Sequence, residues 1–408
     1  MKHRLQEKYI TFEPDVGGWN NIRMQMEVVL VFAAATGRTL VIPPEQAMYL
    51  LDKGKGKENA HSFEDYFPFE KIRKVLKVIT MQQFLEREAL RGHLSQFNDS
   101  SVVLYPPKNQ SVVNAMDRPQ KRAMWAYLRS VAYCPKWEPF HDYIVFPPAP
   151  GVNVSLLPNA SIYDAAKEKF SSKRKAIYYN SFMQNTPLIH FISLPEKGYR
   201  LLTHFYTFLH FEDPFMERYY SRFVRDYIHY VNEIFCYGAS IVQTMVDVSG
   251  GRYAAFHIRR GELQYKEVKL PAADILKNNE KSIPSDIKVA YVATDERNKS
   301  FFEPFHKRFE KVYYLDDFFA ELKLADVNPN FLGMIDQVAC TQGEVFIGTW
   351  FSTFTGYITR LRGYLGHPES SNFFGDKKHR DRYQEYEIPK FPFYMREWRE
   401  AFMDIDEK

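Results

Sequence analysis

The chain has 408 residues, of which 45% are hydrophobic and 25% are charged. This composition is that of an ordinary globular protein and excludes a collagen-like or wholly disordered chain, while the length predicts two domains. The net charge is only +4, so no nucleic acid partner is expected. Aromatic residues are unusually frequent at 16%, which suits a ligand cleft as well as a packed core.

Cysteines and targeting signals give a mixed indication of the compartment. Three cysteines exclude a disulfide framework, and no signal peptide or apolar run of about 18 residues is present, so the chain as given is expected to be soluble. Asn-X-Ser sequons favour the secretory pathway. They occur at Asn98, Asn109, Asn153, Asn159 and Asn298. A luminal enzyme whose membrane anchor lies outside this sequence would have these features.

The first forty residues predict a βαβ unit with a right-handed crossover. Residues 9–12 and 39–42 have the pattern of strands, and apolar residues at helical spacing lie between them until Gly37. Further along, the signals are weaker. Helical stretches are expected near Phe69 and Phe84, a strand near residues 173–179, and a linker or surface loop over residues 146–151.

The second half repeats the alternation of strands and helices. A long helical region over residues 212–246 is expected to begin with Asp213 as the N-cap and Pro214 in the first turn. Strands are predicted at 253–258, 289–293, 312–315 and 345–347, with helices at 331–340 and 353–362. We therefore predict two doubly wound α/β domains, 1–211 and 212–408, with a C-terminal tail that packs back on the first domain. Ligands of such domains bind beyond the carboxyl ends of the strands.

The first polar motif, Phe256 to Glu262, follows a predicted strand. Alternation along the strand places His257 and Arg259 on one side, where one ligand would meet both. The guanidinium group of arginine is planar and permanently charged, and it binds two phosphate oxygens at once. The alternative is a pair of surface arginines tied to carboxylates, beside a half-buried structural histidine.

The second motif, Gly348 to Thr355, leaves a strand and opens a helix. A helix N-terminus presents unpaired N–H groups and attracts anions. The hydroxyls of Ser352 and Thr353 either coordinate such an anion or only cap the helix.

Carboxylates form the third group of candidates. Asp336, on a predicted helix, is suited to accept both the N1–H and the N2–H of guanine, although most helical aspartates are simply solvated. Asp295, with Glu296, follows a strand and either positions a ribose or caps the next helix.

The fourth motif is the first βα turn, Gly17-Gly18-Trp19-Asn20-Asn21. Its glycines permit a close approach of the backbone, and its asparagines either cap the helix or offer amide donors to a substrate. Sequence signatures of dinucleotide sites, phosphate-binding loops, metal sites and the hydrolase nucleophile elbow are absent, so neither a metal nor a redox cofactor is indicated.

Taken in order, these motifs resemble those of the GDP-fucose protein O-fucosyltransferase family, most closely its plant and fungal branch, over about residues 8–365. The segments that carry the resemblance are 17–23, 39–44, 62–67, 257–261, 291–296, 335–337, 346–349 and 352–354. The resemblance implies a two-domain GT-B enzyme, inverting and independent of metal, that moves fucose from GDP-fucose to a hydroxyl, most often Ser or Thr of a protein. The C-terminal half would hold the donor.

The resemblance also assigns roles to residues. Arg259 matches the arginine that holds the donor diphosphate and helps GDP to leave, and Asp336 matches an acid that contacts guanine. Asn20 matches an asparagine of the donor and acceptor cleft, which would make Arg259 and Asn20 the catalytic residues. The expected nucleotide-sugar site contains Gly17, Gly18, Asn20, Asn21, His257, Arg259, Asp295, Asp336, Ser352, Thr353 and Phe354.

Two departures from the family pattern concern carboxylates. Glu262 stands where an aspartate is common, and Gly17 replaces a glutamate that serves some relatives as the general base. An acceptor hydroxyl needs a proton sink within about 3 Å unless the transition state is very dissociative. Glu13 and Asp15 lie nearby in the sequence, but the base is left unassigned.

Three alternatives stay open at this stage. Relatives of this family use UDP-rhamnose on cell-wall glycans, although Asp336 favours guanine over uracil. The missing base is compatible with a pseudoenzyme that binds a nucleotide sugar or a glycan. The third is RNA binding by Arg259, Arg260 and the abundant aromatic residues, which the net charge of +4 disfavours. For the enzyme, the acceptor is a protein or a glycan. The resemblance and the sequons together imply the lumen of the endoplasmic reticulum or Golgi.

Overall fold

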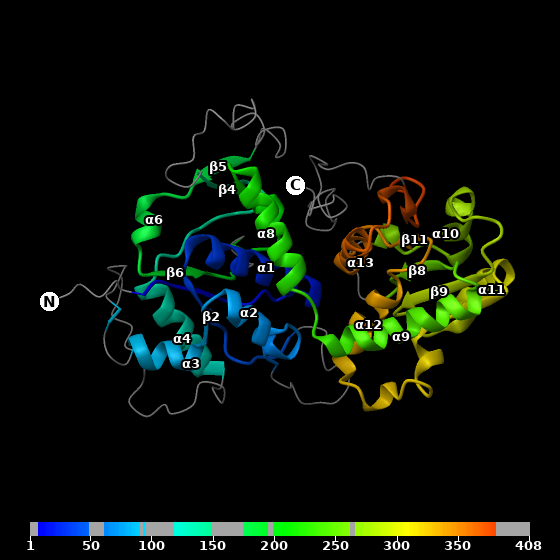
Figure 1. Cartoon of the computed structure of the whole chain (residues 1–408), viewed down its shortest axis with the longest axis horizontal. Coiled ribbons are helices and arrows are strands. Elements are labelled where there is room, and N and C mark those ends of the chain that lie inside the picture. The colour runs from blue at the N-terminus through cyan, green and yellow to red at the C-terminus, as the bar shows by residue number, and fades with distance from the viewer. Residues whose placement is uncertain are drawn as a thin grey trace. The chain divides into compact units, whose positions relative to one another are not determined.

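The structure is a computed structural model that describes residues 7–48, 61–89, 93–94, 118–147, 174–194, 199–261 and 266–380. The chain divides into two compact units, Met1–His229 and Tyr230–Lys408 (Figure 1). The predicted boundary, after residue 211, falls before helix α8 (Pro214–Tyr227). This helix packs on strand β7 (Leu209–Phe211) of the first unit, where the rings of Phe211 and Tyr220 stack 4.6 Å apart. The division therefore falls after α8 rather than before it.

The first unit contains two parallel sheets. Its strands are β1 (Tyr9–Phe12), β2 (Thr39–Ile42), β3 (Val78–Thr80), β4 (Asp142–Phe146), β5 (Lys175–Tyr178), β6 (Leu188–Phe191) and β7. Its helices are α1 (Trp19–Thr36), α2 (Phe69–Val75), α3 (Met81–Phe84), α4 (Arg118–Val131), α6 (Ser181–Asn185), α7 (Phe205–Phe208) and α8. One sheet has the order β3-β2-β1-β6, and the other has the order β5-β4-β7.

In the larger sheet of this unit the order in which the chain adds strands reverses between β1 and β6, although all four strands are parallel. From β1 the chain proceeds to β2 and β3 on one side, and β6 then pairs with β1 on the other side, with Tyr9 opposite Leu188. Ligands of doubly wound sheets bind at such a switch point, beyond the carboxyl ends of the strands. The turn that contains Gly17 and Gly18 directly follows β1 and therefore lies there.

Helix α1 is buried along nearly its whole length. It packs against β1 and β2 on one side and against α7 and α8 on the other (Figure 1). A helix covered on both sides is apolar around its circumference rather than along one stripe, as the run Val28–Ala33 shows. It ends at Gly37, whose φ of 64° is left-handed, so the sequence-based end of the helix is confirmed.

The second unit has one parallel sheet of five strands. They are β8 (Ala254–Ile258), β9 (Val289–Thr294), β10 (Lys311–Tyr313), β11 (Val345–Gly348) and β12 (Asn372–Phe374). The helices are α9 (Asn232–Ser249), α10 (Ala272–Asn279), α11 (Glu303–Arg308), α12 (Leu332–Ala339) and α13 (Thr353–Tyr364). The strand order β10-β9-β8-β11-β12 places the switch point between β8 and β11.

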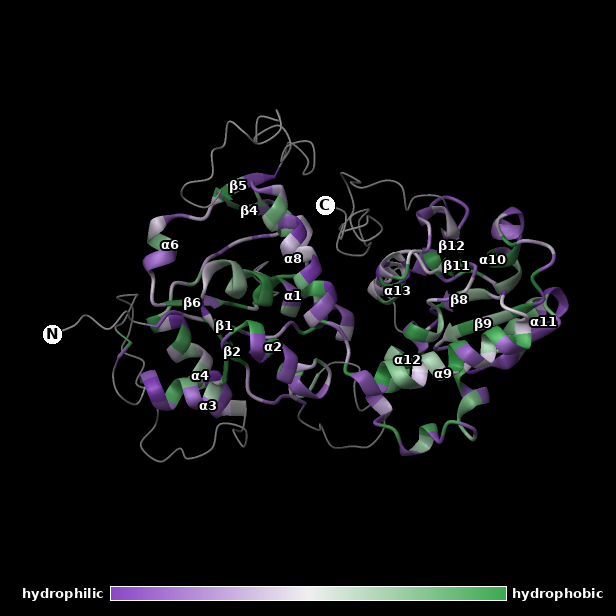
Figure 2. Cartoon of the chain, viewed as in Figure 1, coloured by the Kyte–Doolittle hydropathy of each residue, from purple (hydrophilic) through white to green (hydrophobic). Residues whose placement is uncertain are grey.

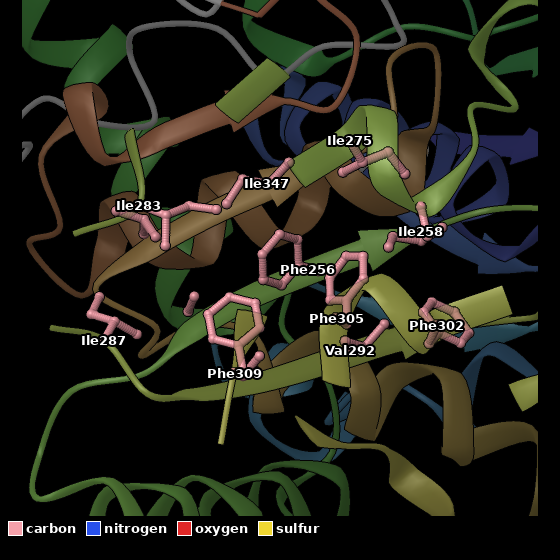
Figure 3. Close-up of a cluster of buried hydrophobic side chains, with 14 of the residues drawn as sticks. Phe256, Ile258, Ile275, Ile283, Ile287, Val292, Phe302, Phe305, Phe309 and Ile347 are labelled. Carbon is pink, nitrogen blue, oxygen red and sulfur yellow. The ribbon is translucent and has the colours of Figure 1, made fainter. Parts of the chain in front are cut away.

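An apolar core holds this sheet to α10 and α11. Phe256 and Val292 of the strands meet Ile275, Phe302 and Phe305 of the covering elements (Figure 3). Figure 2 shows β9 as largely hydrophobic, whereas α9 alternates between hydrophobic and hydrophilic residues. The two α/β units that were expected of a GT-B protein are thus confirmed.

The predicted long helix over residues 212–246 is two helices, α8 and α9. Between them Tyr230 is fully buried and donates a hydrogen bond from its hydroxyl to Gln337 of α12 (2.6 Å). The backbone leaves the helical conformation at Ile228 (φ −108°, ψ 60°), and α9 begins after Val231, whose ψ is 151°. Asp213 does cap α8, since its carboxylate accepts the N–H of Phe215 (2.9 Å). No helix within the described segments has the length and apolarity that crossing a bilayer requires.

Candidate active site

A carboxylate clamp fixes the loop that follows β8. The side chain of Asp295 accepts hydrogen bonds from the backbone N–H groups of Arg260 (2.6 Å) and Gly261 (3.0 Å). A Cβ atom on Gly261 would lie 2.6 Å from Oδ2 of Asp295, so a larger residue would displace this carboxylate from the loop. In the structure Asp295 therefore positions the loop that carries Arg259 and does not cap the next helix, whose N-cap is Asn298. Its contact with a ribose stays a prediction.

Two threonines join the ends of β8 and β11. The Thr349 hydroxyl donates to the carbonyl of His257 (2.9 Å) and accepts from the N–H of Arg259 (3.1 Å). The Thr355 hydroxyl accepts from the N–H of Thr349 (3.0 Å) and lies 2.6 Å from Nδ1 of His257. The main chain of Arg259 is thereby fixed at the switch point between these strands.

His257 is buried, with its ring stacked on Phe354 at 4.4 Å between centroids. Burial, reinforced by the neighbouring charge of Arg259, lowers the pKa of His257 to about 3. The imidazole is therefore neutral at physiological pH. Of these two residues only Arg259 offers a positive charge to a ligand. The contact of one ligand with both residues stays a prediction.

Helix α13 begins at the carboxyl end of β11 with an unusual backbone turn. Phe351, directly before the helix, has a φ of 64°, a left-handed conformation that costs a bulky residue of the order of 1–3 kcal/mol. Ser352 occupies the N-cap position, yet its side chain makes no capping hydrogen bond. Among the residues described, its hydroxyl has no hydrogen-bond partner although the residue is only 2% exposed. A ligand at this helix N-terminus would satisfy it.

Replacing Ser352 with alanine separates its two roles. Loss of an N-cap bond would cost about 1 kcal/mol of stability. Because no such bond exists here, we expect Ser352→Ala to leave the melting temperature unchanged and to weaken GDP binding about tenfold, as the loss of one hydrogen bond to a charged ligand does. Calorimetric titration and thermal unfolding check this. A lower melting temperature with unchanged GDP affinity would identify Ser352 as a cap only.

Asp336 of α12 faces strand β9. Its Oδ1 accepts a hydrogen bond from the hydroxyl of Tyr291 (2.6 Å). Burial raises the pKa of Asp336 to about 7, against the opposing effect of the Tyr291 hydrogen bond. Gln337 next to it donates from Nε2 to the carbonyl of Phe354 (3.1 Å). Asp336 is therefore a buried carboxyl group close to the His257–Phe354 pair. The alternative interpretation, an aspartate exposed to solvent on its helix, is wrong.

The high pKa of Asp336 predicts pH-dependent nucleotide binding. Only the ionised carboxylate accepts both guanine N–H groups, so protonation below pH 7 opposes binding. We expect the affinity for GDP to be about tenfold lower at pH 6 than at pH 8, and we expect Asp336→Asn to weaken binding and abolish this dependence. Titrations across this range, with the phosphate ionisation measured separately on free GDP, check it. Equal pH profiles for both proteins would exclude Asp336 from the guanine site.

The glycine turn of the first unit is tightly packed. Gly18 is the N-cap residue of α1, so Asn20 and Asn21 lie within the first turn and are not caps. A Cβ atom on Gly17 would lie 2.4 Å from Nδ2 of Asn21 and 2.7 Å from Oδ1 of Asp15. A larger residue at this position would therefore displace the side chains of Asn21 and Asp15.

The two carboxylates nearest this turn are engaged in ion pairs. Arg200 binds Asp15 through Nε (2.6 Å) and Nη2 (2.7 Å), and Arg129 binds Glu13 in the same bidentate way (2.7 and 2.6 Å). His190 also contacts Glu13 at 3.0 Å. Burial raises the pKa of Glu13, but the bonds to His190 and Arg129 outweigh it and hold the pKa below its ordinary value. Neither carboxylate is suited to accept a proton from an acceptor.

Within the second unit the structure brings the expected residues into one network. His257 contacts Phe354 and Thr355, Gln337 joins Asp336 to the same segment, and Asp295 holds the loop of Arg259. The hydroxyls that connect these elements belong to Thr349, Thr355 and Tyr291, none of which was among the predicted site residues. Among the described residues no group of three or more His, Cys, Asp and Glu side chains is placed to hold a metal ion. Glu262 lies outside the described residues.

Comparisons with solved structures return fucosyltransferases at low sequence identity. POFUT1 in complex with GDP is 13% identical, with a TM-score of 0.44, over 90% of this chain and 98% of that chain. NodZ alpha-1,6-fucosyltransferase co-crystallised with GDP is 14% identical, with a TM-score of 0.43, over 88% and 93%. Fucosyltransferase NodZ from Bradyrhizobium is 15% identical, with a TM-score of 0.44, over the same shares.

No curated protein sequence matches this chain significantly. A family profile does match, and it covers the segments that hold Gly17, Arg259, Asp336 and Ser352. Because the profile of GDP-fucose protein O-fucosyltransferases matches residues 9–365, the chain belongs to that family and is a fucosyltransferase.

Proposed function

We propose that this fucosyltransferase, whose donor is GDP-fucose, transfers fucose with inversion to a Ser or Thr hydroxyl of a protein, without a divalent cation. The observation that carries the proposal is the arrangement at the switch point between β8 and β11. There the main chain of Arg259 is fixed by Thr349, and the N-terminus of α13 presents the buried, unpartnered hydroxyl of Ser352. These groups are suited to an anionic ligand.

The chemistry of the leaving group supports this assignment. When the bond between fucose and GDP breaks, negative charge develops on the β-phosphate, and a fixed guanidinium and helix N-terminus stabilise that charge. In the proposed reaction Arg259 supplies the positive charge, since His257 is neutral. Asp336 holds the guanine base, and the role of Asn20 stays a prediction from the family resemblance.

The ion pairs of Glu13 and Asp15 bear on when the acceptor hydroxyl loses its proton. Because Glu13 and Asp15 are held by arginines, we infer that departure of GDP runs ahead of proton loss in the transition state. The acceptor oxygen bonds to the anomeric carbon of fucose after the bond from that carbon to the β-phosphate oxygen of GDP has largely broken. The attacking hydroxyl is then acidic and its proton passes to water, so a strong base beside the glycine turn is not required. Inversion follows if the acceptor approaches from the face opposite to GDP.

Calorimetric titration in EDTA with GDP, GDP-fucose and UDP tests the donor site. We expect wild-type protein to bind GDP and GDP-fucose, and Arg259→Ala to lose most of this affinity. Binding of UDP in place of GDP would overturn the donor assignment and favour a rhamnose-type enzyme, and binding of neither would favour a glycan-binding protein. Transfer of labelled fucose to folded protein acceptors or to free glycans then decides the acceptor class.

A secretory location is proposed from the sequons. Asn298 is the sequon that falls within the described residues, and it is exposed, with its Oδ1 accepting from the hydroxyl of Ser300 (2.8 Å). We expect the protein isolated from its native cells to carry a glycan at Asn298, which mass spectrometry with and without glycosidase detects. Asn298→Gln expressed in the same cells is the control, and an unmodified Asn298 in the protein from those cells would count against a luminal location.

A further inference from the structure

A buried chain of hydrogen bonds joins the start of the second unit to the proposed nucleotide site. Tyr230 is the first residue of this unit and lies in the short non-helical stretch between α8 and α9. Its hydroxyl donates to Oε1 of Gln337 on α12 (2.6 Å), and Nε2 of Gln337 donates to the carbonyl of Phe354 in the first turn of α13 (3.1 Å). Tyr230 and Gln337 are both fully buried, so the chain runs through the interior of the unit.

The Tyr230 hydroxyl determines which way the Gln337 amide points. The two ends of an amide differ, because the oxygen accepts hydrogen bonds and the nitrogen donates them. With its oxygen held by Tyr230, the amide turns its nitrogen to the carbonyl of Phe354. A buried oxygen that loses its donor is costly, so the amide would move to recover one. Loss of the hydroxyl would therefore weaken the attachment of α13 to α12.

The ring of Tyr230 adds a second contact between these helices. It packs edge-on against the ring of Tyr357 on α13, with 5.2 Å between the centroids. Tyr230 thus contacts α12 through its hydroxyl and α13 through its ring. Because protein interiors are closely packed, its position helps to set the position of one helix relative to the other.

Both helices carry residues of the proposed nucleotide site. Helix α13 begins directly after Ser352, and the ring of Phe354 in its first turn stacks on His257. On α12, Asp336 directly precedes Gln337. A change in the packing of α12 against α13 would therefore move the proposed guanine contact relative to the proposed phosphate contact.

We propose that Tyr230 is a positioning residue for the nucleotide site and acts on it through Gln337. It holds α12 and α13 in the arrangement that binds GDP, so the segment by which the chain enters the second unit influences the affinity for the donor. The inference rests on the proposed function and adds a residue that acts on the nucleotide only through another. Because the free energy of such a coupling is reciprocal, GDP in turn restrains the stretch around Tyr230.

Titration of GDP into Tyr230→Phe and Gln337→Met, singly and combined, tests the chain. We expect each single variant to bind GDP about 2- to 30-fold more weakly than the wild type, the range for residues that act on a ligand through other residues. The double variant should bind GDP no more weakly than the weaker single variant, because both changes interrupt the same chain.

Tyr253→Phe is the matched control. The hydroxyl of Tyr253 is also buried and donates to α12, at the carbonyl of Ala339 (3.0 Å), but Tyr253 precedes β8 and lies at the opposite end of the strand from the proposed site. Its loss should lower the melting temperature as the loss of the Tyr230 hydroxyl does, and it should leave the affinity for GDP unchanged.

Hydrogen exchange is a second readout, for which the wild-type protein is sufficient. We expect saturating GDP to slow the exchange of backbone amides in residues 228–231 of the wild type. In Gln337→Met saturated with GDP this protection should be absent, since the chain that carries it is interrupted.

Four results would overturn the inference. Unchanged GDP affinity in Tyr230→Phe would mean that the hydroxyl serves stability alone, and additive losses in the double variant would mean that it does not act through Gln337. Equal weakening by Tyr253→Phe would mean that any loosening of α12 disturbs the site, and unprotected amides in the GDP-bound wild type would exclude the coupling. Failure of wild-type protein to bind GDP is a different outcome, because it overturns the proposed function itself.

Discussion

Replacing Arg259 with lysine is expected to lower kcat for fucosyl transfer by about 10²- to 10³-fold, the usual effect of losing one preorganised group at a developing negative charge. Lysine keeps the positive charge but loses the planar guanidinium group that binds two oxygens at once. Its flexible side chain also does not hold the ammonium group at the position where the loop fixed by Asp295 places the guanidinium. The affinity for GDP should fall much less than kcat. Single-turnover transfer from GDP-fucose, together with titration of GDP, measures both.

The neighbouring arginine supplies a matched control. Arg260 lies over the ring of Phe301 at 4.5 Å and donates to the carbonyl of Lys269 (3.1 Å), so its side chain is occupied within the fold. Arg260→Lys should leave kcat within a few-fold of the wild type. Added guanidinium ion should restore part of the activity of Arg259→Ala and none of any loss in Arg260→Ala. Equal losses in the two lysine variants would refute a specific role for Arg259.

Stability of the first unit is expected to depend on a buried ion pair in α1. Arg23 and Glu27, one helical turn apart, have fully buried side chains that bind each other. Arg23→Met leaves the Glu27 carboxylate buried without this counter-charge, which costs about 3–5 kcal/mol. For a unit of this size that corresponds to a melting temperature lower by about 10 °C, which calorimetry measures.

A double variant distinguishes the pair from simple packing. Arg23→Met combined with Glu27→Leu removes both charges and their desolvation penalty, so most of the lost stability should return. The Nε group of Arg23 also donates to Asn20 (3.4 Å), so the double variant should stay folded while losing transfer activity. If it is as unstable as Arg23→Met alone, the ion pair is not the source of the effect.

Hydrophobic patterning predicted the second unit better than the first. Strands such as β8 and β9 are short, buried and rich in apolar residues, and the predicted strands there lie within a few residues of the observed ones. In the first unit the amphipathic α4 and the strand β6, which contains His190, were not predicted. The sheet β5-β4-β7 joins segments far apart in the chain, and no local pattern encodes such pairing.

In the candidate site too, local sequence features were predictable and long-range contacts were not. Residue types and positions after strands were enough to single out Arg259 and Ser352, and residue type alone drew attention to Asp336 on its predicted helix. The contacts of Asp295 and Thr355 are with distant backbone and side-chain groups, which local sequence does not specify.

The ion pairs beside the glycine turn also bear on how the protein folds. Arg129 and Arg200 lie 116 and 185 residues after the carboxylates that they bind. Contacts across such separations form late and slowly, because a long loop must close before they contribute. The glycine turn therefore reaches its final geometry only after most of the first unit has been synthesised and packed. A nascent chain that stops before Arg200 contains the glycine motif without one of the contacts that shape it.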